Sequence, residues 1–348
     1  MPGLEHLRVE ENHSLDEVYA FLTRNGFTDG LPVIPPTPRR VAAMLAGRNP
    51  DDVVAIVEPA RGRASLQALA QCAVMAGCLP EHLPVLVAAT QAVSDPDFNL
   101  LGIQSTTGNT AVFALINGPA VQRLRFNAGG NALGPGCHAN ATVGRALALV
   151  LRNVGGAIPG KRDMATQGQP AKFTCCCAEN EPASPWGPLS VARGFAPGKS
   201  TVTVFGISGM VEVVDSGSAD AEGVLTTLAN SMTIAGTVGG AATLGSGEPL
   251  ILLAPEHAAI IARQMGRAEA QAFLWRHARL PLSCLGPHVR ERVLAAQEAD
   301  GPGDGKTIPV ARRPEDVQIA VVGGVGQKST YVPTWGGGTR SITRAVEA

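Results

Sequence analysis

The residues of this chain that are best suited to chemistry are concentrated in one segment, residues 171–186, which reads AKFTCCCAENEPASPW. A thiolate can act as a nucleophile or metal ligand, and a carboxylate can act as a general acid or base. Burying so many sulfur, carboxylate and amide groups is costly and adds little to packing. The segment therefore predicts Cys176 as a nucleophile or redox thiol, Glu179 as a general acid or base, and Asn180 as a donor to an oxyanion or substrate carboxylate.

The three consecutive cysteines are not expected to have the same role. In an extended strand Cys176 points to the face opposite to Cys175 and Cys177, so that one face packs in the core and the other faces a pocket. We expect the two flanking cysteines to be small core residues, whereas Cys176 is either catalytic or a third buried residue. Lys172 is a nearby cation that would favour a thiolate and would help to bind an anionic substrate.

A second candidate site is the glycine-rich turn and helix start at residues 134–145, GPGCHANATVGR. Asn140 is expected to cap the helix, where free N–H groups bind anions such as carboxylate or phosphate. His138 lies beside this start as an alternative proton carrier, and Arg145 is a further candidate for substrate binding. The alternative is an ordinary capped helix with a surface histidine.

A third candidate is the glycine-rich segment at residues 323–330, GGVGQKST. Gln327 breaks the G-K-[ST] order and no helix is expected to follow, which excludes a nucleotide P-loop. A nest of backbone N–H groups in which Lys328 holds a small anion is compatible with the segment. The strand–GxGxxG–helix pattern of a dinucleotide site does not occur.

These candidates combine into one predicted pocket. Residues 29–37, DGLPVIPPT, contain prolines that exclude a helix and favour an extended strap laid over another surface. We expect Asp29 of this strap, the turn at 134–145 and the segment at 172–186 to surround a small anionic or carbonyl-bearing substrate. The chemistry expected of such a thiol and carboxylate site is redox or carbon–sulfur chemistry, in a thiol-dependent oxidoreductase or lyase.

Two other functions are compatible with the same residues. The first is a cofactor-free lyase or hydratase that uses Glu179 or His138 and no thiol. The second is a non-catalytic scaffold or metal-binding subunit that presents Cys176 to a partner. Seven cysteines without C-x-x-C spacing give no zinc signature, so no cofactor is predicted, although a bound metal ion stays open.

Composition limits the class of protein. The chain has 348 residues, 45% of them hydrophobic and 16% charged, with a net charge of -1, which predicts a large core and a homo-oligomer interface. A near-neutral charge without basic runs argues against nucleic-acid binding. We find neither a signal peptide nor an uninterrupted apolar stretch of about 18 residues, and we therefore expect a soluble cytoplasmic protein without membrane contact.

The pattern of apolar runs predicts an α/β fold made of strand–turn–helix units around largely buried sheets. The expected strands are residues 53–58, 99–104, 111–116, 201–205, 211–214, 250–253 and 317–322. The expected helices are residues 14–26, 37–47, 65–77, 83–93, 140–153, 221–235, 256–264 and 267–279.

An internal duplication is a further expectation. Residues 112–124 and 251–263 both read as an apolar strand, a turn with proline and a helix, and each follows a Gly/Thr-rich turn, at 104–110 and 237–247. A chance match between two such units is the alternative.

The chain is expected to form four segments that pack together rather than independent domains. They are residues 1–50 with the first helix and the strap, 51–195 as a first α/β half with the candidate site, 196–298 as a second half, and 299–348 with a linker at 299–307, a final strand and a glycine-rich loop.

Six motifs together resemble those of a largely uncharacterised bacterial family: DGLP[IV][IV]PPT, VMAGC, NGP, ANATIGRA, NVGG-x-[IV]-PG and C-x-AENE-x-x-PW. Here they are residues 29–37, 74–78, 117–119, 139–146, 153–160 and 176–186. Family members look like companions of thiol or selenol proteins named for a U-G-S-C motif. The resemblance implies redox or sulfur chemistry, with Cys176 as the family cysteine and a separate thiol or selenol partner protein. The family loop G-K-H-S reads G-Q-K-S here, which leaves the role of Lys328 open.

Overall fold

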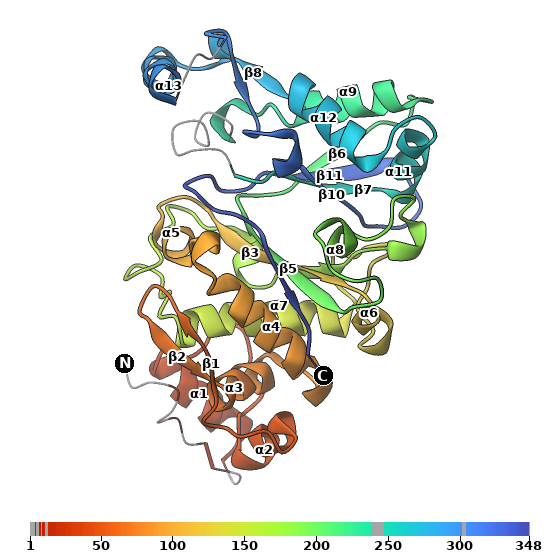
Figure 1. The fold of residues 1–348 in the computed structure, drawn as a ribbon. Helices are drawn as coiled ribbons and strands as arrows, with labels where there is room; N and C mark the ends of the chain where they lie inside the picture. The colour runs from red at the N-terminus through yellow and green to blue at the C-terminus, as the bar shows by residue number, and fades with distance from the viewer. Residues whose placement is uncertain are drawn as a thin grey trace.

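The computed structural model describes residues 13–237, 247–300 and 304–347, together with residues 4, 7, 9 and 10; of residues 297–300 it describes the backbone alone. Helices and strands are mixed along the chain, which confirms the α/β class. Two four-stranded sheets pack face to face, and helices cover their outer faces, so that the molecule has helix, sheet, sheet and helix layers (Figure 1).

The first sheet has the order β12–β5–β3–β4 and the second the order β10–β7–β11–β6. Their strands are β3 (Ala111–Asn117), β4 (Cys176–Ala178), β5 (Thr201–Ile207) and β12 (Ile342–Ala345), and β6 (Val211–Val214), β7 (Leu250–Leu253), β10 (Gln318–Val321) and β11 (Lys328–Val332). Two hairpins lie outside these sheets, β1 (Val53–Val57) with β2 (Gly62–Ser65) and β8 (Arg279–Pro281) with β9 (Thr307–Pro309).

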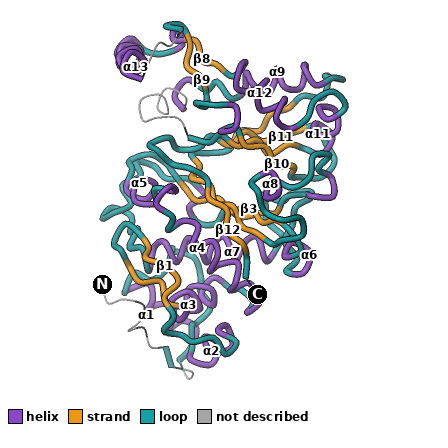
Figure 2. Tube along the Cα trace, in the orientation of Figure 1, coloured by secondary structure: helices purple, strands orange, loops and turns teal. Residues whose placement is uncertain are grey.

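Helices form the outer layers (Figure 2). Those associated with the first sheet are α3 (Leu66–Ala76), α4 (Leu83–Val93) and α7 (His138–Asn153), with α1 (Leu15–Arg24) and α2 (Pro38–Leu45) beyond them. Those on the second sheet are α9 (Ala221–Ser231), α11 (Pro255–Ala262) and α12 (Arg267–His277). The remaining helices are α5 (Leu100–Ser105), α6 (Ala120–Arg123), α8 (Leu189–Ala192) and α13 (Pro287–Asp300).

Strand β3 shows how the sequence produces these layers. All seven of its residues are buried, as expected for a strand covered on both faces. Ala114 and Ile116 face the helices, whereas Phe113 and Leu115 face the second sheet. Phe113 stacks on Phe205 with ring centroids 6.1 Å apart.

The two sheets share one pattern of strand directions, as the predicted duplication requires. In the first, β4 runs parallel to β3, β3 antiparallel to β5, and β5 antiparallel to β12. In the second, β10 runs parallel to β7, β7 antiparallel to β11, and β11 antiparallel to β6. The repeated segments 112–124 and 251–263 form β3 with α6 and β7 with α11, which are equivalent positions.

The last strand of each half is exchanged. β6 follows β5 in sequence but pairs with β11 in the second sheet, and β12 follows β11 but pairs with β5 in the first. Each sheet therefore draws strands from more than one of the four segments expected from the sequence, and the halves are joined through both sheets.

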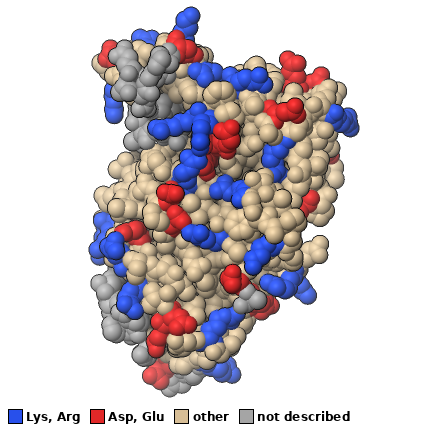
Figure 3. Space-filling model, in the orientation of Figure 1, with Lys and Arg blue, Asp and Glu red and all other residues tan. Residues whose placement is uncertain are grey.

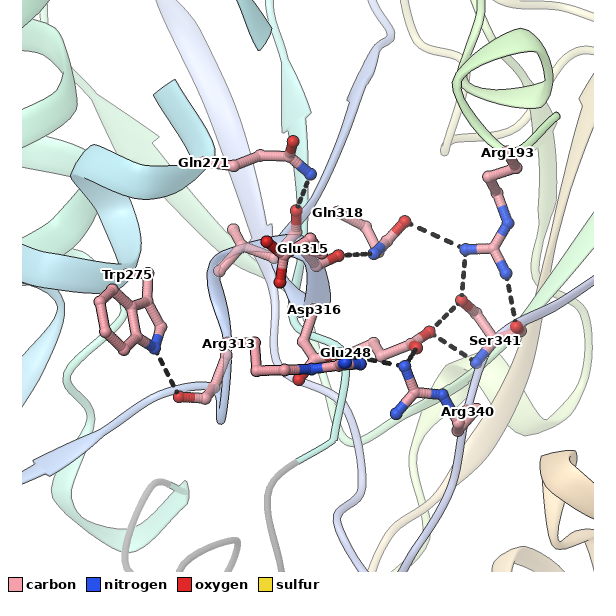
Figure 4. A network of polar contacts seen from close by, with 12 residues as sticks. Arg193, Glu248, Gln271, Trp275, Arg313, Glu315, Asp316, Gln318, Arg340 and Ser341 are labelled. Carbon is pink, nitrogen blue, oxygen red and sulfur yellow. Dashed lines mark hydrogen bonds and ion pairs between the residues drawn. The ribbon is translucent and has the colours of Figure 1, made fainter. Parts of the chain in front are cut away.

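A network of charged residues, in which the carboxylates are buried, also joins the sheets (Figure 4). Arg340 Nη2, just before β12, lies 2.8 Å from Glu248 Oε1 before β7 and 3.0 Å from Asp316 Oδ1 before β10. Arg193 donates hydrogen bonds to Gln318 Oε1 and Ser341 Oγ, at 3.0 and 2.8 Å. Because the carboxylates are buried and paired, the network holds the start of β12 against the second sheet.

Several expected boundaries are confirmed and other expectations are wrong. The strand expected at 317–322 is β10 but is not the final strand, because β11 and β12 follow it. Ser65 caps α3 and Gly77 ends it in the left-handed conformation, as expected. Residues 99–104 are not a strand, because Asn99 caps helix α5 by accepting a hydrogen bond from Gly102 N; a short apolar run does not distinguish the two states. Asn140 does not cap α7, which begins at His138 after Cys137.

Part of the expected linker at 299–307 belongs to elements, since α13 continues to Asp300 and β9 begins at Thr307; residues 301–303 lie outside the described residues. Most of the expected turn at 237–247 also lies outside them, at 238–246. None of the helices in the described parts of the chain has the length and hydropathy of a membrane span. On the face shown in Figure 3, acidic and basic side chains are interspersed among uncharged ones.

Candidate functional site

A cavity of about 500 Å³ lies between the C-terminal half of α7, the first residues of β3 and the loop at 157–173, and we call it the α7 pocket. Its apolar lining residues are Val112, Leu147, Ala148, Leu151, Ala157, Pro159, Pro170, Ala171 and Phe173. Its polar lining residues are Asp29, Gln104, Thr110, Arg152, Asp163, Gln167, Gln169 and Lys172. This size, and a mostly apolar lining with a few polar groups, are typical of small-molecule sites.

The N-terminal strap reaches the α7 pocket through Asp29. Arg145 of α7 donates two hydrogen bonds to Asp29, from Nε to Oδ2 and from Nη2 to Oδ1, each 2.8 Å long. Burial raises the pKa of Asp29, but the hydrogen bonds and charge of Arg145 outweigh it and leave this pKa below its usual value. The pair therefore stays ionised at neutral pH and fixes the strap on α7.

A second ion pair lies in the loop that closes the α7 pocket. Lys172 Nζ lies 2.6 Å from each carboxylate oxygen of Asp163, and the two side chains are 21% and 13% exposed. Lys172 belongs to a short helical turn, Pro170–Lys172, and Asp163 to the preceding loop. The pair thus presents an ammonium and a carboxylate side by side in the wall of the cavity.

Arg152 lines the α7 pocket as a second cation beside Lys172. Its Nη2 donates a hydrogen bond to the carbonyl of Gly26 at 3.2 Å, whereas its buried Nε has no partner among the described residues. Burial lowers the pKa of Arg152, and the charges of Asp29 and Asp163 counteract this effect. Arg152, Asp29 and Asp163 line the same cavity.

The charges of the α7 pocket do not cancel. Asp29, Arg152, Asp163 and Lys172 line the cavity, and Arg145, which is not a lining residue, pairs with Asp29. The Arg145–Asp29 and Lys172–Asp163 pairs are each neutral, so that Arg152 is left as a positive charge in the wall. The buried hydroxyl of Thr110 also lines the cavity and lacks a partner in the described part of the structure. Such a group of donors suits a ligand with an anionic or carbonyl oxygen.

The structure therefore places two of the residues predicted from the sequence, Asp29 and Lys172, in the wall of one cavity, while the predicted Arg145 pairs with Asp29 and does not itself line the cavity. Arg152 and Asp163 are not among the residues that the sequence predicts. Arg152 follows Arg145 by seven positions, two helical turns, so helical periodicity could have placed both on one face of α7. Nothing in the local pattern pairs Asp163 with Lys172, because the contact depends on the fold of the loop.

Cys176 lies outside the α7 pocket. It pairs with Ala114 across β3 and β4 and is buried under α7, where a Cβ built on Gly144 would lie 3.1 Å from its own Cβ. Cys177 is buried between the two sheets, so both faces of this strand are core and neither opens into a pocket. Burial raises the pKa of Cys176 well above the value of a free thiol, and neighbouring cysteines add to this effect.

Glu179 follows β4 and is 1% exposed. Its Oε2 accepts hydrogen bonds from Asn117 Nδ2 at 2.6 Å and from Leu189 N at 2.7 Å. Its Oε1 accepts from Val321 N at 3.4 Å and lies 3.9 Å from Arg267 Nη2. The carboxylate therefore connects β3, α8, β10 and α12, while burial raises its pKa despite these partners.

Glu181 lies beside Glu179, in the corner of the molecule formed by the carboxyl ends of β3 and β4. Its Oε1 accepts hydrogen bonds from Asn117 Nδ2 at 2.9 Å and Gly118 N at 2.6 Å. A second cavity of about 520 Å³ is lined by both glutamates and by the turn after β3. The NGP and AENE motifs thus meet at the carboxyl ends of β3 and β4.

The other predicted residues lie near this corner. Asn140 is buried and bridges the loop before α7, accepting from Asn127 N at 2.9 Å and donating to the carbonyls of Asn127 and Ala132 at 3.0 Å. Exposed His138 begins α7, with its ring centroid 5.9 Å from that of His82.

Asn180 and Lys328 meet the second sheet. The backbone N of Asn180 donates to the carbonyl of Val321 at 2.7 Å, and its Nδ2 donates to the carbonyl of Gly323 at 3.0 Å. Lys328 is exposed and begins β11, paired with Val214. The amide of Asn180 therefore ties the glycine-rich loop to β4.

The predicted residues thus divide between two ends of the first sheet. Ala111 and Val112 at the start of β3 line the α7 pocket, whereas Asn117 at its end contacts Glu179. Ala111 and Asn117 are six positions apart in β3, which corresponds to about 20 Å along a strand. Asp29 and Lys172 are consequently too far from Glu179 to act on the same small substrate.

The family-like motifs fall into the same two groups. The strap, the helix start at 139–146 and the segment 153–160 meet at the α7 pocket. The VMAGC helix packs between them, because a Cβ on Gly77 would lie 3.6 Å from both Ile34 and Thr142.

The chain matches no protein-family model, and no curated protein is significantly similar to it. The family resemblance inferred from the motifs therefore stays a prediction. Among the described residues, no group of three or more histidine, cysteine, aspartate or glutamate side chains is arranged to hold a metal ion.

Alkylation of the folded protein is expected to distinguish the cysteines. Cys284 is exposed, whereas Cys137 and Cys175 are partly exposed, the latter against the expectation of a core residue, so iodoacetamide should modify Cys284 first. Cys176 should react about 100-fold more slowly than Cys284, because its thiol is buried and its raised pKa keeps it protonated. Mass spectrometry of timed digests at pH 8 measures these rates, and all seven cysteines should react in denaturant. Equal rates at Cys176 and Cys284 in the folded protein would support a thiol mechanism.

Proposed function

We propose that this chain is an enzyme that binds a small anionic or carbonyl-bearing substrate in the α7 pocket and acts on it by acid–base chemistry of the lyase or hydratase class. The observation that carries the proposal is the Lys172–Asp163 pair, an ammonium and a carboxylate that line the cavity together. Arg152, which also lines the cavity and belongs to neither ion pair, favours an anionic substrate.

The two members of the pair have complementary roles. Two of the three N–H groups of Lys172 reach Asp163, and the third is left for a substrate oxygen. As Lys172 binds that oxygen, Asp163 removes a proton from the adjacent carbon. The electron pair of the broken C–H bond moves towards the carbonyl, and the ammonium stabilises the negative charge that develops on oxygen.

The burial of Cys176 favours this acid–base reaction over the thiol mechanism, because a protonated and covered thiol is a poor nucleophile. Glu179 and His138, the acid–base residues expected from the sequence, lie at the other end of the sheet from the α7 pocket. A homo-oligomer, and a separate thiol or selenol protein as partner, stay predictions from composition and resemblance.

Solvent exchange tests the proposed reaction on several classes of substrate side by side. The protein is incubated in D₂O with a panel of 2-keto, 2-hydroxy, 3-hydroxy and 2-enoic acids, and NMR follows deuterium at the carbon next to the carbonyl or carboxylate. We expect exchange or elimination in at least one class. Asp163→Asn and Lys172→Met should each slow it by about 100-fold.

Two controls accompany this experiment. Cys176→Ala should retain the rate, and so should Lys161→Met, which removes an exposed lysine from the same loop. No exchange with any class, full activity in Asp163→Asn, or loss of activity in Cys176→Ala with a folded protein would contradict the proposal.

A further inference from the structure

We infer that the ligand of the α7 pocket is an amphiphilic monoanion, a carboxylate with an apolar tail, and that Arg152 is the residue that binds its anionic group. The inference deepens the proposed function by naming the substrate class, and it rests on the use of the same pocket.

The anionic half of the inference follows from the guanidinium of Arg152. One of its N–H groups is used by the carbonyl of Gly26, while its buried Nε has no partner among the described residues. Arg152 also lines the cavity, so a ligand oxygen there would accept hydrogen bonds from its guanidinium. A guanidinium also matches a carboxylate in geometry, since both are planar and can form two parallel hydrogen bonds.

The number of charges on the ligand follows from the charges already present. Asp29 is engaged by Arg145, and Asp163 by Lys172, so the two pairs are internally neutral. Arg152 supplies the remaining positive charge. One carboxylate balances it, whereas a dianion would leave an uncompensated negative charge beside two aspartates.

The apolar half of the inference follows from the lining residues beside Arg152 on the same helix. Leu147, Ala148 and Leu151 present an aliphatic surface along one side of α7, and Val112 and Phe173 continue it on the strand and the loop. A cavity of about 500 Å³ corresponds to the volume of roughly 17 water molecules, enough for a carboxylate with a tail of several carbons. Burial of each methylene on this wall should strengthen binding about fourfold until the cavity is full.

Calorimetric titration with straight-chain alkanoates tests the inference. We expect affinity to rise from butyrate to hexanoate by about fourfold per methylene. Hexanol and hexylammonium should bind at least tenfold more weakly than hexanoate, because they lack the negative charge. Equal binding of hexanol, stronger binding of hexylammonium, or no alkanoate binding would overturn the inference.

Three variants locate the binding. Arg152→Gln should weaken hexanoate binding at least tenfold, and Arg152→Lys should restore part of it because the charge returns without the planar fork. Arg24→Gln, which removes an exposed arginine of α1, is the matched control and should bind as the parent protein does. If Arg152→Gln lowers the melting temperature so far that the protein is not folded, Ala148→Leu provides a second test. The larger side chain should fill part of the cavity and reverse the chain-length preference, so that butyrate binds more tightly than hexanoate. Unchanged binding in folded Arg152→Gln, or an unchanged preference in Ala148→Leu, would overturn the inference.

These titrations can fail independently of the proposed reaction. Alkanoates lack the keto or hydroxyl group on which the reaction acts, so they report binding alone. Binding without exchange in D₂O would leave the ligand class standing and contradict the acid–base function. Exchange in D₂O with one of these acids, without binding of any alkanoate, would do the reverse.

Discussion

Replacing Glu179 by alanine is expected to lower the free energy of unfolding by about 3–5 kcal/mol, because it removes one partner of a buried, hydrogen-bonded charge. The side chains of Glu179 and Arg267 are 0% and 10% exposed, so water cannot replace the lost carboxylate. Asn117 Nδ2 and Leu189 N would lose an acceptor at the same time. Chemical denaturation monitored by circular dichroism measures the change.

The control for this variant is Glu181→Ala. Glu181 shares Asn117 with Glu179 but is partly exposed, so its loss should cost about 1 kcal/mol. A cost below about 1 kcal/mol for Glu179→Ala would show that the carboxylate does not hold the strand ends together.

Glu179 should also make stability depend on pH. Its pKa is raised in the folded protein, so between the ordinary carboxyl pKa of 4.5 and the raised value the folded state binds more protons than the unfolded state. Stability contributed by this group is complete at acid pH and falls as the pH rises through that interval. Glu179→Gln removes the titration, and the difference in stability between the two proteins should change with pH in this direction.

Replacing Gly118 by alanine is expected to destabilise the fold by about 2–5 kcal/mol. Gly118 has a φ of +80°, which strains any residue with a Cβ. The added Cβ would also lie 2.4 Å from the carbonyl oxygen of Lys199 and 2.8 Å from Ser200 Cα. Because both contacts are backbone, the start of β5 must move.

Gly187→Ala is the matched control for this substitution. Its φ is +76°, and nothing lies within 4 Å of the added Cβ, so only the conformational cost of about 1–2 kcal/mol applies. Thermal unfolding of the two variants separates steric overlap from strain. Equal losses in both would contradict the close approach of the NGP turn to β5.

Helices and strands are predicted well where a single local sequence pattern, such as a capping box or an apolar run, identifies the element. Ser14 with Glu17 forms the expected capping box of α1, and the apolar run at 250–253 is β7 to the residue. The strand expected at residues 99–104 is wrong because their apolar run suits both a strand and a buried helix. The exchange of β6 and β12 could not be predicted, since strand partners depend on packing between distant parts of the chain.

The residues of the candidate site also divide into those that local sequence predicts and those whose position depends on the fold. Asp29, Arg145 and Lys172 are predicted as substrate-binding residues; the structure places Asp29 and Lys172 in the wall of one cavity, and Arg145 pairs with Asp29. Cys176 and Glu179 are predicted to act together because they are close in sequence. One is a core residue under α7 and the other a buried junction at the end of the strand, because successive residues at a strand end face different layers.

The most direct test of the central claim is the position of a bound ligand. A crystal structure of the protein with hexanoate should show the carboxylate at Arg152 and the tail against Leu147 and Leu151 of α7. Density for the ligand beside Glu181 and Gly118, at the other end of β3, would contradict the account and would indicate that the second cavity is the binding site.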